Sequence, residues 1–80
     1  MAKTDRKDPL KLFGENIKRL REAKGLSLRN LATMCKLDHS NIGKLEKGER
    51  NITILTILEL AKALEVHPKK LFDLPFDLEE

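Results

Sequence analysis

Cysteine is almost missing from this 80-residue chain, which contains only Cys35. A single cysteine cannot form an internal disulfide, and Cys35, His39 and His67 do not have the spacing of a zinc cluster. One reduced thiol is typical of a cytosolic protein. No apolar run approaches the length of a transmembrane helix, and the polar N-terminus does not have the pattern of a signal peptide. We therefore expect a cytoplasmic protein with no metal or other cofactor.

The sequence also lacks the groups of residues that catalysis requires. Its four glycines are isolated from one another, so they form no glycine-rich phosphate-binding loop. His39 and Ser40 are neighbours in a predicted helix, which prevents the imidazole from serving that hydroxyl as a base in the usual geometry. Glu79 and Glu80 are paired carboxylates, but they lie in a polar tail. We expect that the protein is not an enzyme.

The charge of the chain is unevenly distributed. Residues 1–50 contain 13 Lys and Arg against 7 Asp and Glu, a formal charge of +6. Residues 51–80 contain 3 Lys against 6 Asp and Glu, a formal charge of −3. A basic half favours a domain that binds a polyanion such as nucleic acid. The alternative is a small intracellular domain with a few surplus lysines. A chain of this length forms one small domain with a modest core, which oligomerisation often stabilises.

Residues 27–50 predict two short helices joined by a tight turn. Ser27 can cap the first helix and Asp38 the second, and Gly48 ends the second helix, which spans 39–46. Within both helices the apolar residues recur at helical spacing and therefore share one face. Polar side chains remain exposed at the front of the second helix, where they suit the reading of base edges in a major groove. They are His39, Ser40, Asn41 and Lys44.

This pattern resembles the helix-turn-helix of the Cro and phage-repressor (XRE) family, and the resemblance extends over about 13–72. Ala32 stands at the family's small-residue position, and Ile42 stands at a buried position of its recognition helix. Two positions depart from the family pattern. Lys36 replaces the usual turn glycine, which tends to need a positive φ, and Leu28 replaces a frequent glutamine that contacts DNA.

The resemblance implies an all-α fold: a compact five-helix lambda-repressor-like DNA-binding domain with a short extended C-terminal tail. We expect a flexible N-terminal arm over residues 1–8. The helix-turn-helix domain would span 9–73, with its motif at 27–47. The tail would span 74–80.

Apolar spacing and capping residues predict the three remaining helices. The first begins near Asp8 and Pro9 and ends before Gly25. The fourth begins after the cap Thr53, and the short fifth has His67 as its cap. The residues predicted to face the core in these last two helices are Ile54, Ile57, Leu60, Ala61, Leu64, Leu71 and Phe72.

Leu55 and Leu58 form a second apolar face on the fourth helix, which predicts that something covers it. The C-terminal tail alternates apolar and polar residues, which indicates an extended segment with one apolar edge. Either this tail or a second subunit could cover the fourth helix, and partly exposed leucines without a role are the third possibility. In the family, dimers form through the fifth helix and its neighbours. The resemblance therefore implies a dimer interface containing Leu55, Leu58, Phe72, Leu74 and Phe76.

The resemblance also assigns roles to individual residues. In the family, an arginine of the first helix pairs with a glutamate near the end of the recognition helix, and Arg21 and Glu46 match these positions. We expect this structural salt bridge to orient the recognition helix. Base contacts are expected from His39, Ser40, Asn41 and Lys44. Phosphate contacts are expected from Ser27, Arg29, Lys47, Arg50 and Asn51.

The resulting functional prediction is a small transcriptional regulator that binds double-stranded DNA in a sequence-specific manner. It would act as a homodimer on a palindromic operator, with helix 38–47 in the major groove. The run RNITI at 50–54 is similar to that of the controller proteins of restriction–modification systems. The alternative is an antitoxin or another protein–protein module that uses the same fold to bind a partner protein.

Overall fold

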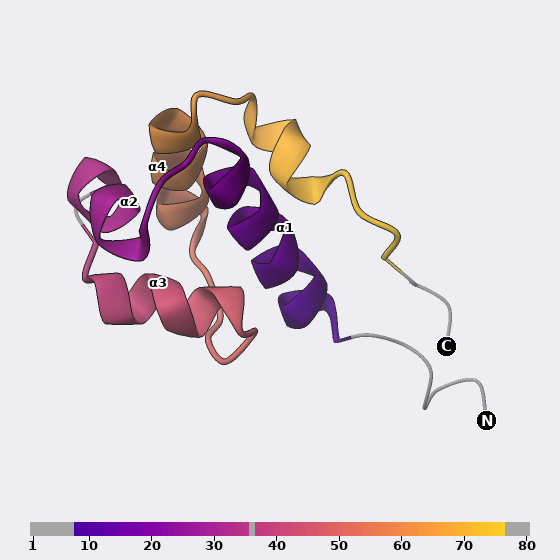
Figure 1. The fold of residues 1–80 in the computed structure, drawn as a ribbon. Helices are drawn as coiled ribbons and strands as arrows, with labels where there is room; N and C mark the ends of the chain where they lie inside the picture. Colours follow the sequence, from indigo (N-terminus) through magenta and orange to yellow (C-terminus); the bar gives the residue numbers. More distant parts are fainter. Residues whose placement is uncertain (1–7, 36, 77–80) are drawn as a thin grey trace.

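A computed structural model describes residues 8–35 and 37–76. It contains the α-helices α1 (Pro9–Ala23), α2 (Leu28–Cys35), α3 (His39–Glu46) and α4 (Ile54–Leu64), followed by the 3-10 helix η2 (Pro68–Phe72) (Figure 1). The all-α fold predicted from the sequence is confirmed, and the predicted fifth helix is a 3-10 helix. None of the described helices combines the length and the hydropathy that a membrane span requires.

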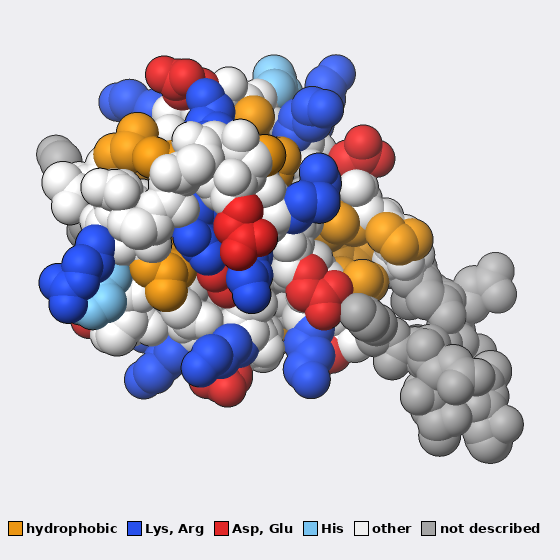
Figure 2. All heavy atoms as spheres, in the orientation of Figure 1, with side chains coloured by type: hydrophobic (Ala, Val, Ile, Leu, Met, Phe, Trp, Pro, Cys, Tyr) orange, Lys and Arg blue, Asp and Glu red, His pale blue; other side chains and the backbone are white. Residues whose placement is uncertain are grey.

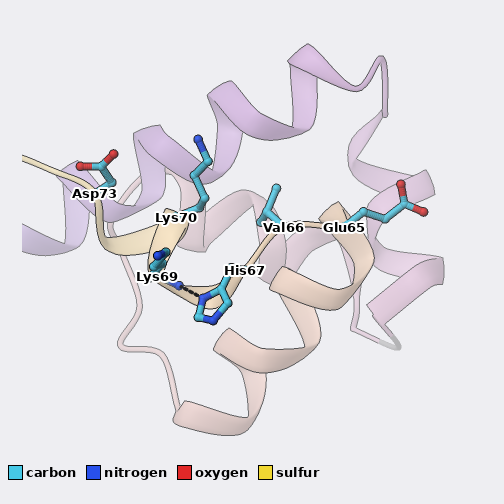
Figure 3. Close-up of a pocket in the computed structure, with 6 residues that line it drawn as sticks. All are labelled: Glu65, Val66, His67, Lys69, Lys70 and Asp73. Carbon is cyan, nitrogen blue, oxygen red and sulfur yellow. Dashed lines mark hydrogen bonds between the residues drawn. The ribbon is translucent and has the colours of Figure 1, made fainter.

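Capping side chains mark where α1, α2 and α4 begin, and those of Ser27 and Thr53 were predicted. Side-chain oxygens of Asp8, Ser27 and Thr53 each accept a hydrogen bond from a backbone N–H in the following turn, at 2.8, 3.0 and 3.2 Å. Nδ1 of His67 accepts from the backbone N–H of Lys69 at 3.1 Å and opens η2 in the same way (Figure 3). These bonds satisfy N–H groups that have no partner within a first helical turn.

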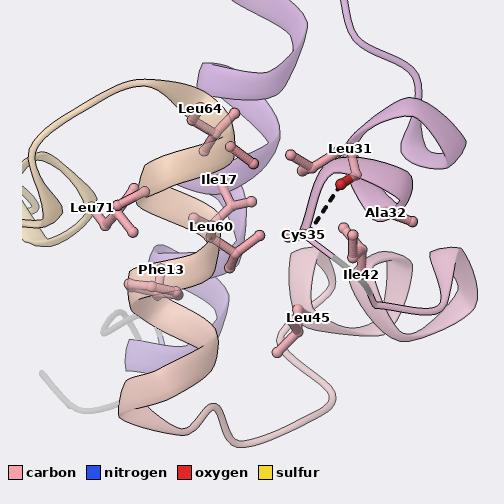
Figure 4. Packing of buried hydrophobic residues seen from close by; sticks show 12 residues of the cluster. Phe13, Ile17, Leu31, Ala32, Cys35, Ile42, Leu45, Leu60, Leu64 and Leu71 are labelled. Carbon is pink, nitrogen blue, oxygen red and sulfur yellow. Dashed lines mark hydrogen bonds between the residues drawn. The ribbon is translucent and has the colours of Figure 1, made fainter.

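The hydrophobic core lies where the five elements meet. Figure 4 shows side chains of α1, α4 and η2 facing those of α2 and α3. Six large apolar side chains are completely buried there: Ile17, Leu31, Ile42, Leu60, Leu64 and Leu71. Burial of each such side chain stabilises the folded state by roughly 1.5–3 kcal/mol. The core therefore contains at least one residue from every helix, including the short α3.

Two residues predicted to face the core lie at its margin instead. Ile54 is 72% exposed, because it is the first residue of α4 and that turn projects beyond the core. Phe72 is 47% exposed, although its ring contacts Phe13 with a centroid distance of 5.2 Å. Full burial of these two side chains was a wrong expectation. The later turns of α4 are buried as predicted at Leu60 and Leu64.

The C-terminal segment leaves η2 on the side of α1 (Figure 1). Residues 73–76 form no strand, and the backbone N–H groups of Leu74 and Phe76 each donate to the carbonyl oxygen two residues earlier at 2.8 Å. Such bonds close γ-turns. Leu74 packs against the core, and the described part of the segment leaves Leu55 of α4 75% exposed. Leu78 and the predicted arm, apart from Asp8, lie outside the described residues.

A buried amide attaches η2 to α1. Asn16 is only 3% exposed, and its Nδ2 donates to the carbonyl oxygens of Lys70 at 3.0 Å and Leu71 at 3.3 Å. Its Oδ1 accepts from the Arg19 guanidinium. Both ends of the amide are therefore satisfied, as a buried polar group requires. The sequence offered one indication of this role, a polar residue within the apolar stripe of α1.

A close approach of α1 to the end of α3 requires glycine at position 14. A Cβ atom at Gly14 would overlap the carbonyl oxygen of Leu45 and lie 2.6 Å from that of Glu46. Both obstacles are backbone atoms, which cannot move aside as a flexible side chain can. The absence of a side chain at this position therefore lets the backbones of α1 and α3 touch.

Replacement of Gly14 tests this contact. Gly14→Ala should lower the free energy of unfolding by about 1–3 kcal/mol, because the added methyl group forces the two helices apart. Gly43→Ala is the matched control within a helix, since a Cβ there would meet only Cδ1 of Leu28 at 3.8 Å. It should raise stability by roughly 0.5–1 kcal/mol through helix propensity. Urea unfolding of both variants measures the difference, and equal effects would contradict the close contact.

Candidate nucleic-acid interface

The exposed edge of α3 carries the four side chains predicted to contact bases, and we call it the reading edge: His39, Ser40, Asn41 and Lys44. Ile42 and Leu45 of the same helix are buried, so the opposite edge of the helix faces solvent. Ser40 and Lys44 are exposed, and His39 and Asn41 are half-buried. Lys and Arg side chains gather along the lower border of the molecule, where α3 lies (Figure 2). The arrangement presents hydrogen-bonding groups beside exposed Lys and Arg side chains.

A negative charge lies immediately before the first turn of α3. Asp38 occupies the N-cap position, but its side chain caps no backbone N–H, which corrects the expectation of a capping carboxylate. Instead it accepts a hydrogen bond from the Ser40 hydroxyl, and this bond is the main reason why the pKa of Asp38 lies below its usual value. Nδ1 of His39 lies 3.8 Å from the other carboxylate oxygen. The Ser40 hydroxyl proton is therefore already in use in the free protein.

The loop that follows α3 folds back and contacts the reading edge. Gly48 has a φ of +75° and ends α3, and the N–H of Glu49 donates to the carbonyl of Lys44 at 2.9 Å. This turn brings Arg50 back along the helix, where its Nη1 donates to Oδ1 of Asn41 at 2.5 Å. The two residues line a small hollow of about 90 Å³ together with Leu37 and neighbouring residues of the loop. The loop thus supports the middle of the reading edge.

A buried ion pair joins α3 to α1. Arg21 Nε donates to Glu46 Oε2 at 2.7 Å, and Arg21 Nη2 donates to Oε1 at 3.1 Å. The two side chains are 10% and 6% exposed. Arg21 Nη1 also donates to the Leu26 carbonyl at 2.8 Å. The hydrogen bond with Glu46 raises the pKa of Arg21 above its ordinary value, so the guanidinium remains charged. The structure thus brings together the two residues expected to form the salt bridge.

The residues expected to contact phosphates flank the reading edge. Ser27 and Arg29 lie at the start of α2, and both are exposed. Lys47, Arg50 and Asn51 follow α3 and are also exposed. Lys36, in the turn between α2 and α3, lies outside the described residues. Leu28 is half-buried and packs against the core, a placement that suits a structural role better than contact with DNA.

Apolar side chains are also exposed on α4 and η2. Leu55 and Leu58 of α4 are 75% and 47% exposed, and we call these two residues the α4 patch. Phe72 of η2 is also exposed, and hydrophobic side chains are visible beside η2 and the following segment in Figure 2. Neighbouring exposed leucines, unlike apolar residues scattered singly, are a feature of surfaces that contact another molecule.

Among the described residues, the remaining polar groups do not assemble into a site for a small ligand. A hollow of about 590 Å³ between α4 and η2 is open and lined by exposed groups of both charges, among them Glu65, Lys69 and Asp73 (Figure 3). Within residues 8–35 and 37–76, no three His, Cys, Asp or Glu side chains are grouped as metal ligands. Cys35 is buried, and burial raises the pKa of its thiol. This thiol donates to the Leu31 carbonyl at 3.0 Å (Figure 4).

Comparisons with known proteins agree with this geometry. Residues 17–71 match the helix-turn-helix family. The control protein C.BamHI of Bacillus amyloliquefaciens is 38% identical over 63 residues, which cover 78% of this chain and 78% of the relative.

Two solved structures of regulatory proteins are also similar to this chain. The restriction–modification controller protein C.AhdI from Aeromonas hydrophila has a TM-score of 0.78 and 46% identity over 79% of this chain and 96% of its own. SinR, a master regulator for biofilm formation crystallised in complex with DNA, has a TM-score of 0.72 and 29% identity over 76% of this chain and 98% of its own.

The buried ion pair can be tested by removing one partner. Glu46→Ala leaves the Arg21 charge buried without its counter-ion and should lower the free energy of unfolding by about 3–5 kcal/mol. Glu49→Ala is the matched control, because Glu49 is an exposed glutamate three residues later. The double variant Arg21→Met, Glu46→Leu should recover most of the loss, since apolar residues remove the unpaired charge. Denaturant unfolding of these variants gives the comparison, and a small effect of Glu46→Ala would contradict the buried pair.

Proposed function

The chain belongs to the helix-turn-helix family, and we propose that it is a small transcriptional regulator that binds double-stranded DNA as a homodimer. The observation that carries this proposal is the reading edge: a polar, cationic helix edge held outward by a buried ion pair and a backbone contact on its other side. The controller proteins among its relatives and the DNA complex of SinR support the same function. Regulation of a restriction–modification system is the more specific form of the proposal.

Helix α3 would lie in the major groove. Its eight residues span one groove width, since an α-helix rises 1.5 Å per residue. Lys44 suits the O6 and N7 acceptors of guanine, and His39, Ser40 and Asn41 would reach neighbouring base edges. Gly43 has no side chain and leaves room for the helix backbone to approach the groove. The direct readout would therefore come from side chains of one short helix.

Phosphate contacts would fix the position of α3 in the groove. The candidates are Ser27, Arg29, Lys47, Arg50 and Asn51, which lie at the start of α2 and in the loop after α3. Exposed Lys and Arg side chains in these positions would release counter-ions when they meet the DNA backbone. These contacts add affinity without adding sequence preference.

A second copy of the chain would cover the apolar surface. One α3 reads only a short half-site, so a two-fold pair on a palindromic operator is needed for strong specificity. The proposed interface contains the α4 patch together with Phe72, Leu74 and Phe76. The exposure of the α4 patch supports this proposal, because the described part of the C-terminal segment does not cover it.

Substitutions of Lys44 and Lys47 distinguish base reading from phosphate contact. Lys44→Ala should relax the preference at one base pair, at a cost of about 1–3 kcal/mol for the preferred base. Lys47→Ala should weaken binding to all sequences alike and lower the magnitude of the salt slope by about one. Selection of bound duplexes from a random pool, followed by titration at several salt concentrations, measures both quantities. If neither variant changes them, α3 does not lie in the groove as proposed.

The introduction of a charge into the α4 patch tests whether this surface forms the dimer interface. Leu55→Lys should shift the protein from dimer to monomer, because a charged side chain would be buried in the pairing surface. Its fold should be unaffected, since Leu55 is mostly exposed in the single chain. Sedimentation analysis measures the association state, and Leu55→Met is the apolar control. A wild-type protein that is monomeric even with its operator would favour a partner protein on this surface instead.

A further inference from the structure

We propose that Arg50 is a positioning residue that fixes which atoms of Asn41 can meet a base. The proposal rests on the function proposed above, with α3 in the major groove, and adds a specificity determinant to it. Its basis is the hydrogen bond from Arg50 Nη1 to Asn41 Oδ1, which joins the loop after α3 to the middle of the reading edge. We call this bond the 41–50 bond.

The chemistry of arginine settles the orientation of the Asn41 amide. A guanidinium carries only hydrogen-bond donors, so the atom of Asn41 that faces it has to be the carbonyl oxygen. The two donors on Nδ2 then point away from Arg50. In the free protein Asn41 therefore presents N–H groups, and one of the two lone pairs of its Oδ1 is already used.

This orientation changes what Asn41 can read. A free asparagine pairs with adenine through two bonds: its Nδ2 donates to N7, and its Oδ1 accepts from N6. Arg50 takes one of the two lone pairs of Oδ1, and its positive charge weakens this oxygen as an acceptor while it strengthens the Nδ2 donors, so the contact relies mainly on donation. Major-groove acceptors are O6 and N7 of guanine, N7 of adenine and O4 of thymine, whereas cytosine presents only a donor. The 41–50 bond therefore reduces the advantage of adenine and favours guanine or thymine at this position.

The shape of the arginine side chain allows it to hold Asn41 and a phosphate at the same time. One nitrogen of the planar fork is directed to Asn41, and the others remain available to a phosphate oxygen. Lysine has a single terminal nitrogen, which a phosphate would draw away from Asn41. Arg50→Lys should therefore retain the charge that binds the backbone while it releases the amide.

The matched control is the same substitution at Arg29. Arg29 is also exposed and is also a proposed phosphate contact, but it lies on α2. In a selection from random duplexes, wild-type protein should prefer guanine or thymine to adenine at the base pair that Asn41 reads. Arg50→Lys should raise the relative preference for adenine about fivefold or more, with little change in the salt slope. Arg29→Lys should leave this preference unchanged.

A variant that lacks the Asn41 amide tests whether Arg50 acts through this residue. In Asn41→Ala, the further change Arg50→Lys should have no additional effect on base preference, because the amide is gone. Without DNA, the side-chain amide resonances of Asn41 should shift in Arg50→Lys and stay in place in Arg29→Lys. This NMR measurement does not depend on DNA binding.

The outcomes separate the two proposals. Uniform weakening of all sequences by Arg50→Lys, or a wild-type preference for adenine at this position, would overturn the role of Arg50 and leave α3 as the reading helix. Unmoved Asn41 resonances in Arg50→Lys would overturn it as well. A wild-type protein that binds no duplex in the selection would overturn both the role of Arg50 and the proposed function.

Discussion

The ion pair between Arg21 and Glu46 is the interaction on which the position of α3 depends. A helix of eight residues is too short to be stable alone in water, so tertiary contacts have to hold it. Two apolar side chains, Ile42 and Leu45, anchor one face but would tolerate a small rotation or shift. The two parallel hydrogen bonds of the guanidinium add a directional constraint at the C-terminal end. The contact at Gly14 adds a steric one, because backbone meets backbone there.

Helix α1 therefore acts as the common support of two surfaces. On one side it contacts α3 through Gly14 and Arg21, and on the other it binds η2 through the amide of Asn16 (Figure 1). All three residues lie within two turns of one helix. Helix α1 thus links α3, which carries the reading edge, to η2, which carries Phe72 of the proposed pairing surface. In a two-fold pair, the separation between these two surfaces would set the distance between half-sites.

Local chemistry made most of the fold predictable from the sequence. Caps such as Ser27 and Thr53 mark helix starts because their side chains bond to the next turn, a relation that depends on adjacent residues only. The pairing of Arg21 with Glu46 was expected from resemblance to a family, since 25 residues separate the two. Burial of Ile54 was predicted wrongly, because periodicity assigns a face but does not show where the core ends. The 41–50 bond could not be predicted, since it depends on the path of the turn at Gly48.

The hydrogen bonds at the surface of α3 affect recognition as much as those beneath it. Ser40 donates to Asp38, and Asn41 accepts from Arg50, so two of the four reading side chains already have a partner in the free protein. Each bond restricts rotamers before DNA arrives, which lowers the entropy cost of binding. Each also uses one proton or one lone pair that a base could otherwise bind. The residue types on a recognition helix are therefore insufficient to predict its preferred bases, because neighbouring side chains decide which polar atoms remain free.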